Sequence, residues 1–143
     1  MTNSRSIGRS FEYKIIGMLT DELGTSFNFK RDIEQYRERD LGDVISDNDK
    51  WPFLIECKRR KNGTTYSLDW VDQAKRAAEK CNKIPVVIYQ LMRSPVRCVV
   101  DLNVILKAFD CPTACFHENL IELPLETFCM IAREIMQDEV LAL

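Results

Sequence analysis

The chain has 143 residues, of which 45% are hydrophobic and 29% charged, and its formal net charge is −2. This length predicts one domain with a substantial core, and the composition excludes a disordered chain. No run approaches the roughly 18 apolar residues of a membrane span, and the six cysteines lie mostly in apolar runs. We therefore expect a cytosolic protein with reduced thiols, not a secreted disulfide framework.

The charge is unevenly distributed along the chain. Residues 1–100 contain 18 Lys and Arg against 14 Asp and Glu, whereas residues 101–143 contain 2 against 8. Binding of phosphate depends on local clusters of positive charge more than on the total. The acidic total therefore does not exclude a nucleic-acid partner, although a solvated charged face remains the alternative for any single cluster.

The first half of the chain predicts a helix followed by three strands. Apolar residues at helical spacing indicate a helix over about residues 5–23, ended by Gly24. A strand is expected over 26–30, and the charged stretch 32–41 is expected to form an exposed loop. Residues 43–46 and 53–58 are typical of two antiparallel strands joined by a turn.

The second half continues with helices and strands. A helix is expected from Ser67 or Asp69 to about Cys81, followed by strands over 84–91 and 96–100. Asp101 is suited to cap a short helix over 102–109, and a cysteine-rich loop precedes a C-terminal helix over about 125–141. The pattern predicts a single α/β domain over residues 1–143. Its central mixed five-stranded sheet is flanked by helices, with a helical extension at about 102–143.

The most informative feature is Glu56-Cys57-Lys58, within a strand that is otherwise apolar. Side chains two residues apart on a strand share a face, so Glu56 and Lys58 lie together, with Cα atoms about 6.5–7 Å apart. Two charges there are costly unless they pair or bind a metal ion. With Asp43 upstream, the group suits metal-assisted phosphodiester hydrolysis. A weak ion pair or a solvated strand end is the alternative.

Four features on four expected elements together resemble the PD-(D/E)XK nuclease superfamily. They are Glu12 on the first helix, Gly42-Asp43 on one strand, Glu56-Cys57-Lys58 on the next, and Gln73 on the following helix. More narrowly, the chain is similar to archaeal-type Holliday junction resolvases and related phage-encoded proteins over about residues 5–100. One departure is Gly42, because a proline often precedes the aspartate. The resemblance implies a restriction-endonuclease-like fold.

The resemblance also implies a metal site. Asp43, Glu56 and the main-chain carbonyl of Cys57 would bind Mg²⁺, for which Mn²⁺ would substitute, since hard cations prefer oxygen ligands. Glu12 would complete the metal shell or hold a metal-bound water, and one or two metals are both compatible with the sequence. Taken alone, Glu12 also suits an ordinary surface charge. Asp40 is a rival to Asp43, which is preferred because a strand follows it directly.

Two further residues would act on the water and the substrate. Lys58 would orient or deprotonate the attacking water and offset developing negative charge. Gln73 would orient the ligands or contact the substrate.

The resemblance implies branched DNA as substrate, with four-way junctions cut to 5′-phosphate and 3′-hydroxyl ends. A junction presents two symmetrical strands, so a homodimer is expected. The alternatives are a nuclease of the same fold acting on other DNA in restriction, nicking or repair, and an inactive DNA-binding or assembly module. A phage-encoded protein would work in the host cytoplasm. The residues expected to bind DNA phosphates are Arg5, Arg9, Lys14, Lys30, Arg31, Arg37, Arg39, Arg59, Arg60 and Lys61.

The C-terminal region raises a separate question of structural zinc. Cys111, Cys115 and His117 are close in sequence, and Cys129 follows. Their spacing is not a standard zinc pattern, and the aromatic neighbours favour core packing. His117 is the only histidine, which excludes nuclease mechanisms that need several histidines.

Overall fold

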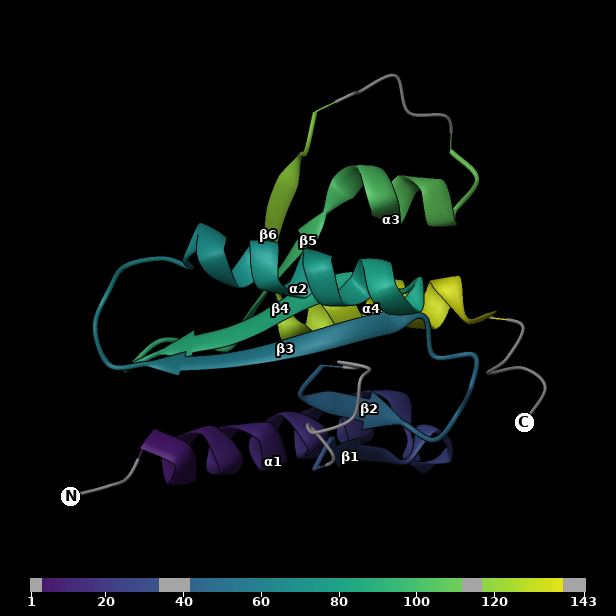
Figure 1. Ribbon diagram of the computed structural model, residues 1–143. Coiled ribbons are helices and arrows are strands. Elements are labelled where there is room, and N and C mark those ends of the chain that lie inside the picture. Colours follow the sequence, from purple (N-terminus) through teal and green to yellow (C-terminus); the bar gives the residue numbers. More distant parts are fainter. Residues whose placement is uncertain (1–3, 34–41, 112–116, 138–143) are drawn as a thin grey trace.

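A six-stranded mixed sheet organises the computed structural model, which describes residues 4–33, 42–111 and 117–137 (Figure 1). The strands lie across the sheet in chain order: β1 (Phe29–Arg31), β2 (Val44–Ser46), β3 (Phe53–Arg60), β4 (Ile84–Leu91), β5 (Arg97–Asp101) and β6 (Leu120–Pro124). β3 and β4 are parallel, and the other neighbouring pairs are antiparallel. This bears out the predicted α/β fold, with one strand more than expected.

Helices cover both faces of this sheet. The helical segments are α1 (Ser4–Leu23), the 3-10 turn η1 (Thr25–Phe27), α2 (Leu68–Cys81), α3 (Leu102–Ala108) and α4 (Leu125–Ile135). α2 lies on one face and α1 with α4 on the other (Figure 1). α2 is the crossover that the parallel pair β3 and β4 requires. In the described part of the chain, no helix is long and apolar enough to cross a membrane.

The predicted apolar stripe of α1 is buried against the sheet. Phe11, Ile15 and Leu19 are at most 4% exposed, and they share one core with α4. On α4 the ring of Phe128 lies 5.0 Å, centroid to centroid, from that of Phe53 on β3. α4 therefore packs against the same face of the sheet as α1.

Residues 26–32 differ from the prediction. Thr25–Phe27 form η1, and Asn28 adopts the left-handed region with φ 48°, so the strand begins only at Phe29. Asp32 was expected in an exposed loop but is buried, at 8% exposure. Its main-chain N–H donates to the carbonyl of Asp43 across 3.1 Å, which continues the pairing beyond β1 and β2. The predicted loop at 34–41 lies outside the described residues.

The predicted loop before the last helix was also partly wrong. Residues Leu120–Pro124 form β6, which pairs antiparallel with β5 and places Leu123 opposite Cys98. These five residues, which end in a proline, show no clear alternation of apolar and polar side chains. The strand forms because β5 offers an edge with which it can pair. α4 begins at Leu125 as predicted and is described to Ile135, so the expected end near 141 lies outside the described residues.

Candidate active site

β3 places Glu56 and Lys58 on the same face of the sheet, as the alternation predicts. Glu56 is only 2% exposed, whereas Lys58 is half-buried. Their partners on β4 are Val87 and Tyr89, both of which pack with α2. A buried carboxylate between apolar neighbours is costly to charge unless a cation or hydrogen bonds compensate it. Glu56 therefore has the environment of a functional group more than that of a surface charge.

Asp43 lies at the edge of β3, immediately before β2. Its main-chain N–H donates to the carbonyl of Ile55 across 2.8 Å. Its carboxylate Oδ2 accepts from the main-chain N–H of Cys57 across 2.7 Å. Asp43 thus extends the pairing with β3 before β2 begins, and this double attachment fixes the carboxylate beside the Glu56-Cys57-Lys58 segment.

Gly42 makes this close approach possible. Its φ is +88°, and a Cβ atom there would lie 2.5 Å from the carbonyl oxygen of Ile55. Proline cannot adopt a positive φ, and any side chain would push the two strands apart. The glycine that departs from the family pattern is therefore required by this backbone.

α2 supplies the partner of Lys58. The Lys58 Nζ donates to Oε1 of Gln73 across 3.0 Å. Gln73 is placed by the start of α2, where Oγ of Ser67 accepts from the N–H of Asp69 across 3.2 Å and caps the helix. Gln73 therefore holds the ammonium group near the site, a contact more specific than the general orienting role expected from the sequence.

Glu12 reaches toward the same region from α1, where it forms an ion pair with Arg31 of β1. The Arg31 guanidinium also lies 5.4 Å from the ring centroid of Tyr13. Burial raises the pKa of the Glu12 carboxyl; the Arg31 hydrogen bond opposes this, and the charge of Asp43 raises the pKa further. This pair was not predicted, because it depends on how α1 packs against β1.

The pKa of the Cys57 thiol is affected by the charges of these nearby acids. Its pKa is raised well above the ordinary value, first by burial and then by the negative charges of Asp43, Glu12 and Glu56. The charges of three carboxylates, one on α1, one just before β2 and one on β3, therefore act on this thiol.

The acids fit a metal ion in chemistry, since carboxylate and carbonyl oxygens are the ligands that Mg²⁺ prefers. Among residues 4–33, 42–111 and 117–137, however, no three His, Cys, Asp or Glu side chains are grouped to hold a metal. Asp43 is turned to the Cys57 N–H and Glu12 to Arg31. A shared metal ion would therefore require these side chains to move closer together.

Several residues expected to bind DNA have partners within the protein. Lys30 pairs with Asp47, and the guanidinium of Arg60 lies 4.8 Å from the ring centroid of Trp70. Arg31 on β1 pairs with Glu12. The set also includes Arg5 and Arg9 on α1, Arg59 at the end of β3, and Lys61 just after it. Arg37, Arg39 and the rival ligand Asp40 lie outside the described residues.

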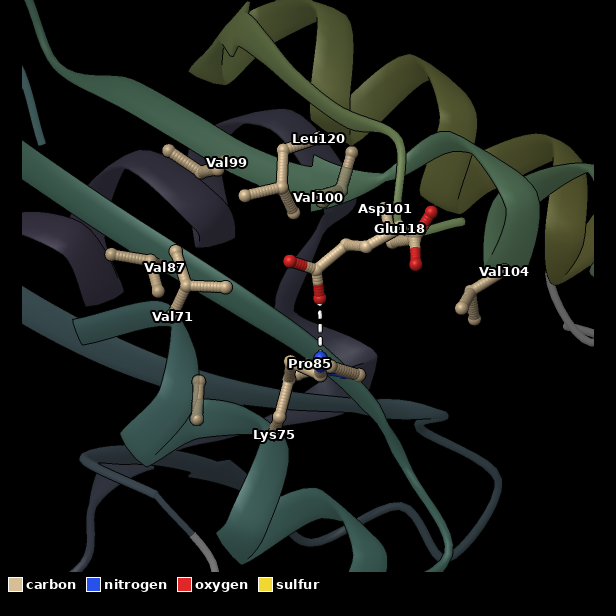
Figure 2. Close-up of a pocket in the computed structure, with 11 residues that line it drawn as sticks. Val71, Lys75, Pro85, Val87, Val99, Val100, Asp101, Val104, Glu118 and Leu120 are labelled. Atoms are coloured by element: carbon tan, nitrogen blue, oxygen red, sulfur yellow. Dashed lines mark hydrogen bonds and ion pairs between the residues drawn. The ribbon is translucent and has the colours of Figure 1, made fainter. Parts of the chain in front are cut away.

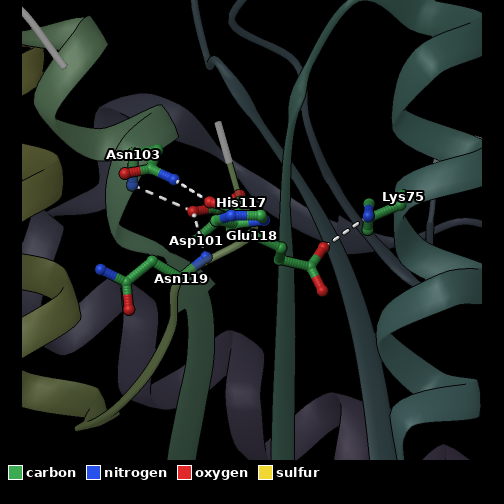
Figure 3. A network of polar contacts seen from close by, with 6 residues as sticks. All are labelled: Lys75, Asp101, Asn103, His117, Glu118 and Asn119. Carbon is green, nitrogen blue, oxygen red and sulfur yellow. Dashed lines mark hydrogen bonds and ion pairs between the residues drawn. The ribbon is translucent and has the colours of Figure 1, made fainter. Parts of the chain in front are cut away.

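An apolar pocket is lined by residues of α2 and of strands β4 and β5 (Figure 2). Lys75 and Glu118 form an ion pair at its rim. Beside it, Oδ1 of Asp101 accepts from the N–H groups of Asn103, across 3.0 Å, and Asn119, across 3.3 Å (Figure 3). These contacts cap α3 and fix the start of β6.

The same network bears on the zinc hypothesis. The carbonyl of His117 accepts from Nδ2 of Asn103 across 2.5 Å (Figure 3), and Cys111 is exposed. Cys129 is fully buried on α4, and burial raises its pKa to about 12, which disfavours the thiolate that zinc binds. Cys115 lies outside the described residues.

Comparison with known proteins agrees with the geometry. A family model described as "Phage putative PDDEXK endonuclease" matches residues 3–132. Among solved structures, the chain is similar to Archaeoglobus fulgidus Hjc, a Holliday junction resolvase, with a TM-score of 0.54 and 18% identity. The alignment covers 85% of this chain and 99% of that one, and it shows a shared fold. No curated protein matches the sequence.

Proposed function

This chain belongs to the phage PDDEXK endonuclease family, and we propose that it is a Mg²⁺-dependent enzyme that cuts branched DNA as a homodimer. The observation that carries the chemistry is the burial of Glu56 at 2% exposure, on the same strand face as Lys58 and beside the tethered carboxylate of Asp43. A buried carboxylate is costly to charge unless hydrogen bonds or a cation compensate it, and a metal ion shared with Asp43 would supply such compensation.

Asp43, Glu56, the carbonyl of Cys57 and Glu12 would hold the metal, and Mn²⁺ would substitute. When bound, the cation would supply charge neutralisation for the phosphate and activation of a water molecule. Lys58 would orient the attacking water as an ammonium group or, as the neutral amine, accept its proton. Gln73, which accepts a hydrogen bond from Lys58 Nζ across 3.0 Å, would keep that group aimed at the phosphate.

The choice of substrate is a more specific proposal than the metal-dependent chemistry. The fold shared with a protein described as a Holliday junction resolvase supports a four-way junction. A junction offers two equivalent phosphates, which two sites related by a two-fold axis would cut together. The basic balance of residues 1–100 supports nucleic-acid binding, whatever the branching of the substrate.

The test compares labelled four-way junctions, nicked duplex and linear duplex of matched sequence, with Mg²⁺, with Mn²⁺ and with a chelator. The proposal predicts paired, symmetrical cuts in the junction only when metal is present. Cutting of linear duplex alone would assign a different DNA substrate, and binding without cleavage would indicate an inactive module. Sedimentation equilibrium with and without junction tests the homodimer.

A further inference from the structure

A groove leads away from the candidate active site along the N-terminal half of α1, which lies beside the C-terminal end of β3 (Figure 1). Two hollows form it, and they adjoin because both are lined by Ile7 and Arg59. The hollow nearer the site also contains Cys57 and Lys58. The groove is therefore continuous with the site itself.

The walls of the groove carry hydrogen-bond donors and positive charge. On α1, Ser6, Ser10 and Lys14 recur every four residues and share one face. The opposite wall carries Arg59 and Lys61. No Asp or Glu is among the described residues that line either hollow. Such a lining favours an anion over a cation or an apolar ligand.

Gln90 holds the two central cations of this groove in place. Its side-chain Oε1 accepts from Lys14 Nζ across 3.0 Å, and its carbonyl accepts weakly from Arg59 Nη1 across 3.5 Å. Among the described residues, the hydrogen-bond acceptors of both cations are neutral groups of Gln90, so these contacts do not cancel the positive charges of Lys14 and Arg59. By contrast, Lys30 and Arg31 are neutralised by ion pairs with Asp47 and Glu12.

Gly8 forms part of the groove lining near the site. A Cβ atom at this position would meet nothing within 4 Å, so packing does not demand a glycine. Glycine inside a helix is also less favourable than alanine. Its lack of a side chain leaves open the hollow that Lys58 and Arg59 also line.

From these features we infer that the α1 groove binds the sugar–phosphate backbone of a DNA arm on one side of the scissile phosphate. Ser6, Ser10, Lys14 and Arg59 donate to successive phosphates, and Gly8 gives the backbone clearance. The inference rests on the proposed nuclease function and adds a path for the substrate. Contacts of this kind position DNA without reading its sequence.

A pair of glycine variants tests this path. Gly8→Asp would place a carboxylate in the groove, whereas Gly17→Asp places the same group on the same helix where a Cβ also meets nothing within 4 Å. Binding of a labelled four-way junction and a labelled duplex is measured by fluorescence anisotropy with a chelator present, so cleavage is not required. We expect Gly8→Asp to weaken binding at least about tenfold and Gly17→Asp less than about twofold.

The salt dependence supplies a second, independent readout. Lys14→Gln and Arg59→Gln should each reduce the slope of log K against log salt by about 1, as expected for one lost phosphate contact. Lys107→Gln, at an exposed position on α3, should leave the slope unchanged. Circular dichroism confirms that each variant is folded.

The outcomes separate this inference from the proposed function. The groove would be rejected, and the nuclease proposal kept, by one combination of results. In it the wild-type protein binds and cuts DNA, Gly8→Asp and Gly17→Asp bind with equal affinity, and Lys14→Gln and Arg59→Gln leave the salt slope unchanged. If the folded wild-type protein bound no DNA, the nuclease proposal and the groove would both be rejected.

Discussion

Oδ2 of Asp43 accepts a hydrogen bond from the main-chain N–H of Cys57 across 2.7 Å. A residue just before β2 is thereby attached to β3 at the segment that carries Glu56 and Lys58. The main-chain N–H of Asp43 also donates to the carbonyl of Ile55, so both the backbone and the side chain of this residue are bonded to β3. This makes Asp43 both a structural and a candidate catalytic group, and two substitutions can separate these roles.

Asp43→Asn keeps an oxygen acceptor for the Cys57 N–H, whereas Asp43→Ala removes it. The alanine variant should lose about 1–3 kcal/mol of unfolding free energy, because it leaves a partly buried donor unsatisfied. The asparagine variant should stay within about 1 kcal/mol of wild type. Both should cut DNA at least about 100-fold more slowly, since neither supplies the charge. Urea denaturation and cleavage rates check the two parts; equal stability losses would contradict the structural role.

Gly42→Ala should destabilise the protein through strain and through a clash with the Ile55 carbonyl. The matched control is Gly24→Ala, because Gly24 has a similar φ of +90° but open space around its Cβ position. The control should lose about 1 kcal/mol from backbone strain alone. Gly42→Ala should lose about 3 kcal/mol or more, measured by urea denaturation. Similar losses in the two variants would show that the close approach to β3 is unimportant.

The contact between Lys58 and Gln73 predicts a graded loss of activity. Lys58→Ala should lower kcat by about 10²–10⁴, the range for a group that handles the reacting proton. Gln73→Ala should lower it by about tenfold with little change in DNA affinity, because the ammonium is misdirected but present. Gln73→Glu, which restores an acceptor, should recover part of the rate. An unchanged kcat in Gln73→Ala would exclude a positioning role; Glu79→Ala on the same helix is the control.

Glu12→Gln should stabilise the protein slightly at neutral pH while abolishing metal-dependent cleavage. The folded-state pKa of Glu12 is raised, chiefly by burial. Ionised Glu12 therefore lowers stability above its folded-state pKa, and this penalty disappears as pH falls below its unfolded-state pKa. The difference in Tm between the variant and wild type should shrink on acidification. A variant less stable than wild type at every pH would contradict this sign.

Much of the fold and of the candidate site followed from the sequence. Periodicity located α1 and α2, and alternation placed Glu56 and Lys58 on one strand face. The antiparallel pairing of β2 with β3 also matched the prediction. These features are local, because propensity and side-chain spacing along a single segment determine them.

The features that were missed depend on contacts between distant segments. β6 exists because β5 offers it an edge, and Asp32 is buried because its backbone joins that of Asp43. The Arg31 ion pair with Glu12 depends on the packing of α1 against β1. Its sequence signal was a single basic residue, which was expected only to contact phosphate. The roles in metal binding and catalysis stay predictions.

The central claim is that a divalent cation bound at Glu56 and Asp43 drives DNA cleavage. The most direct measurement is the single-turnover cleavage rate of a labelled four-way junction by wild type and Glu56→Gln, across a Mg²⁺ titration. We predict no wild-type cleavage with a chelator, saturable activation by Mg²⁺, and a loss of at least about 100-fold in Glu56→Gln with junction binding retained. Equal rates for folded wild type and folded Glu56→Gln, or wild-type cleavage that persists in the chelator, would contradict the account.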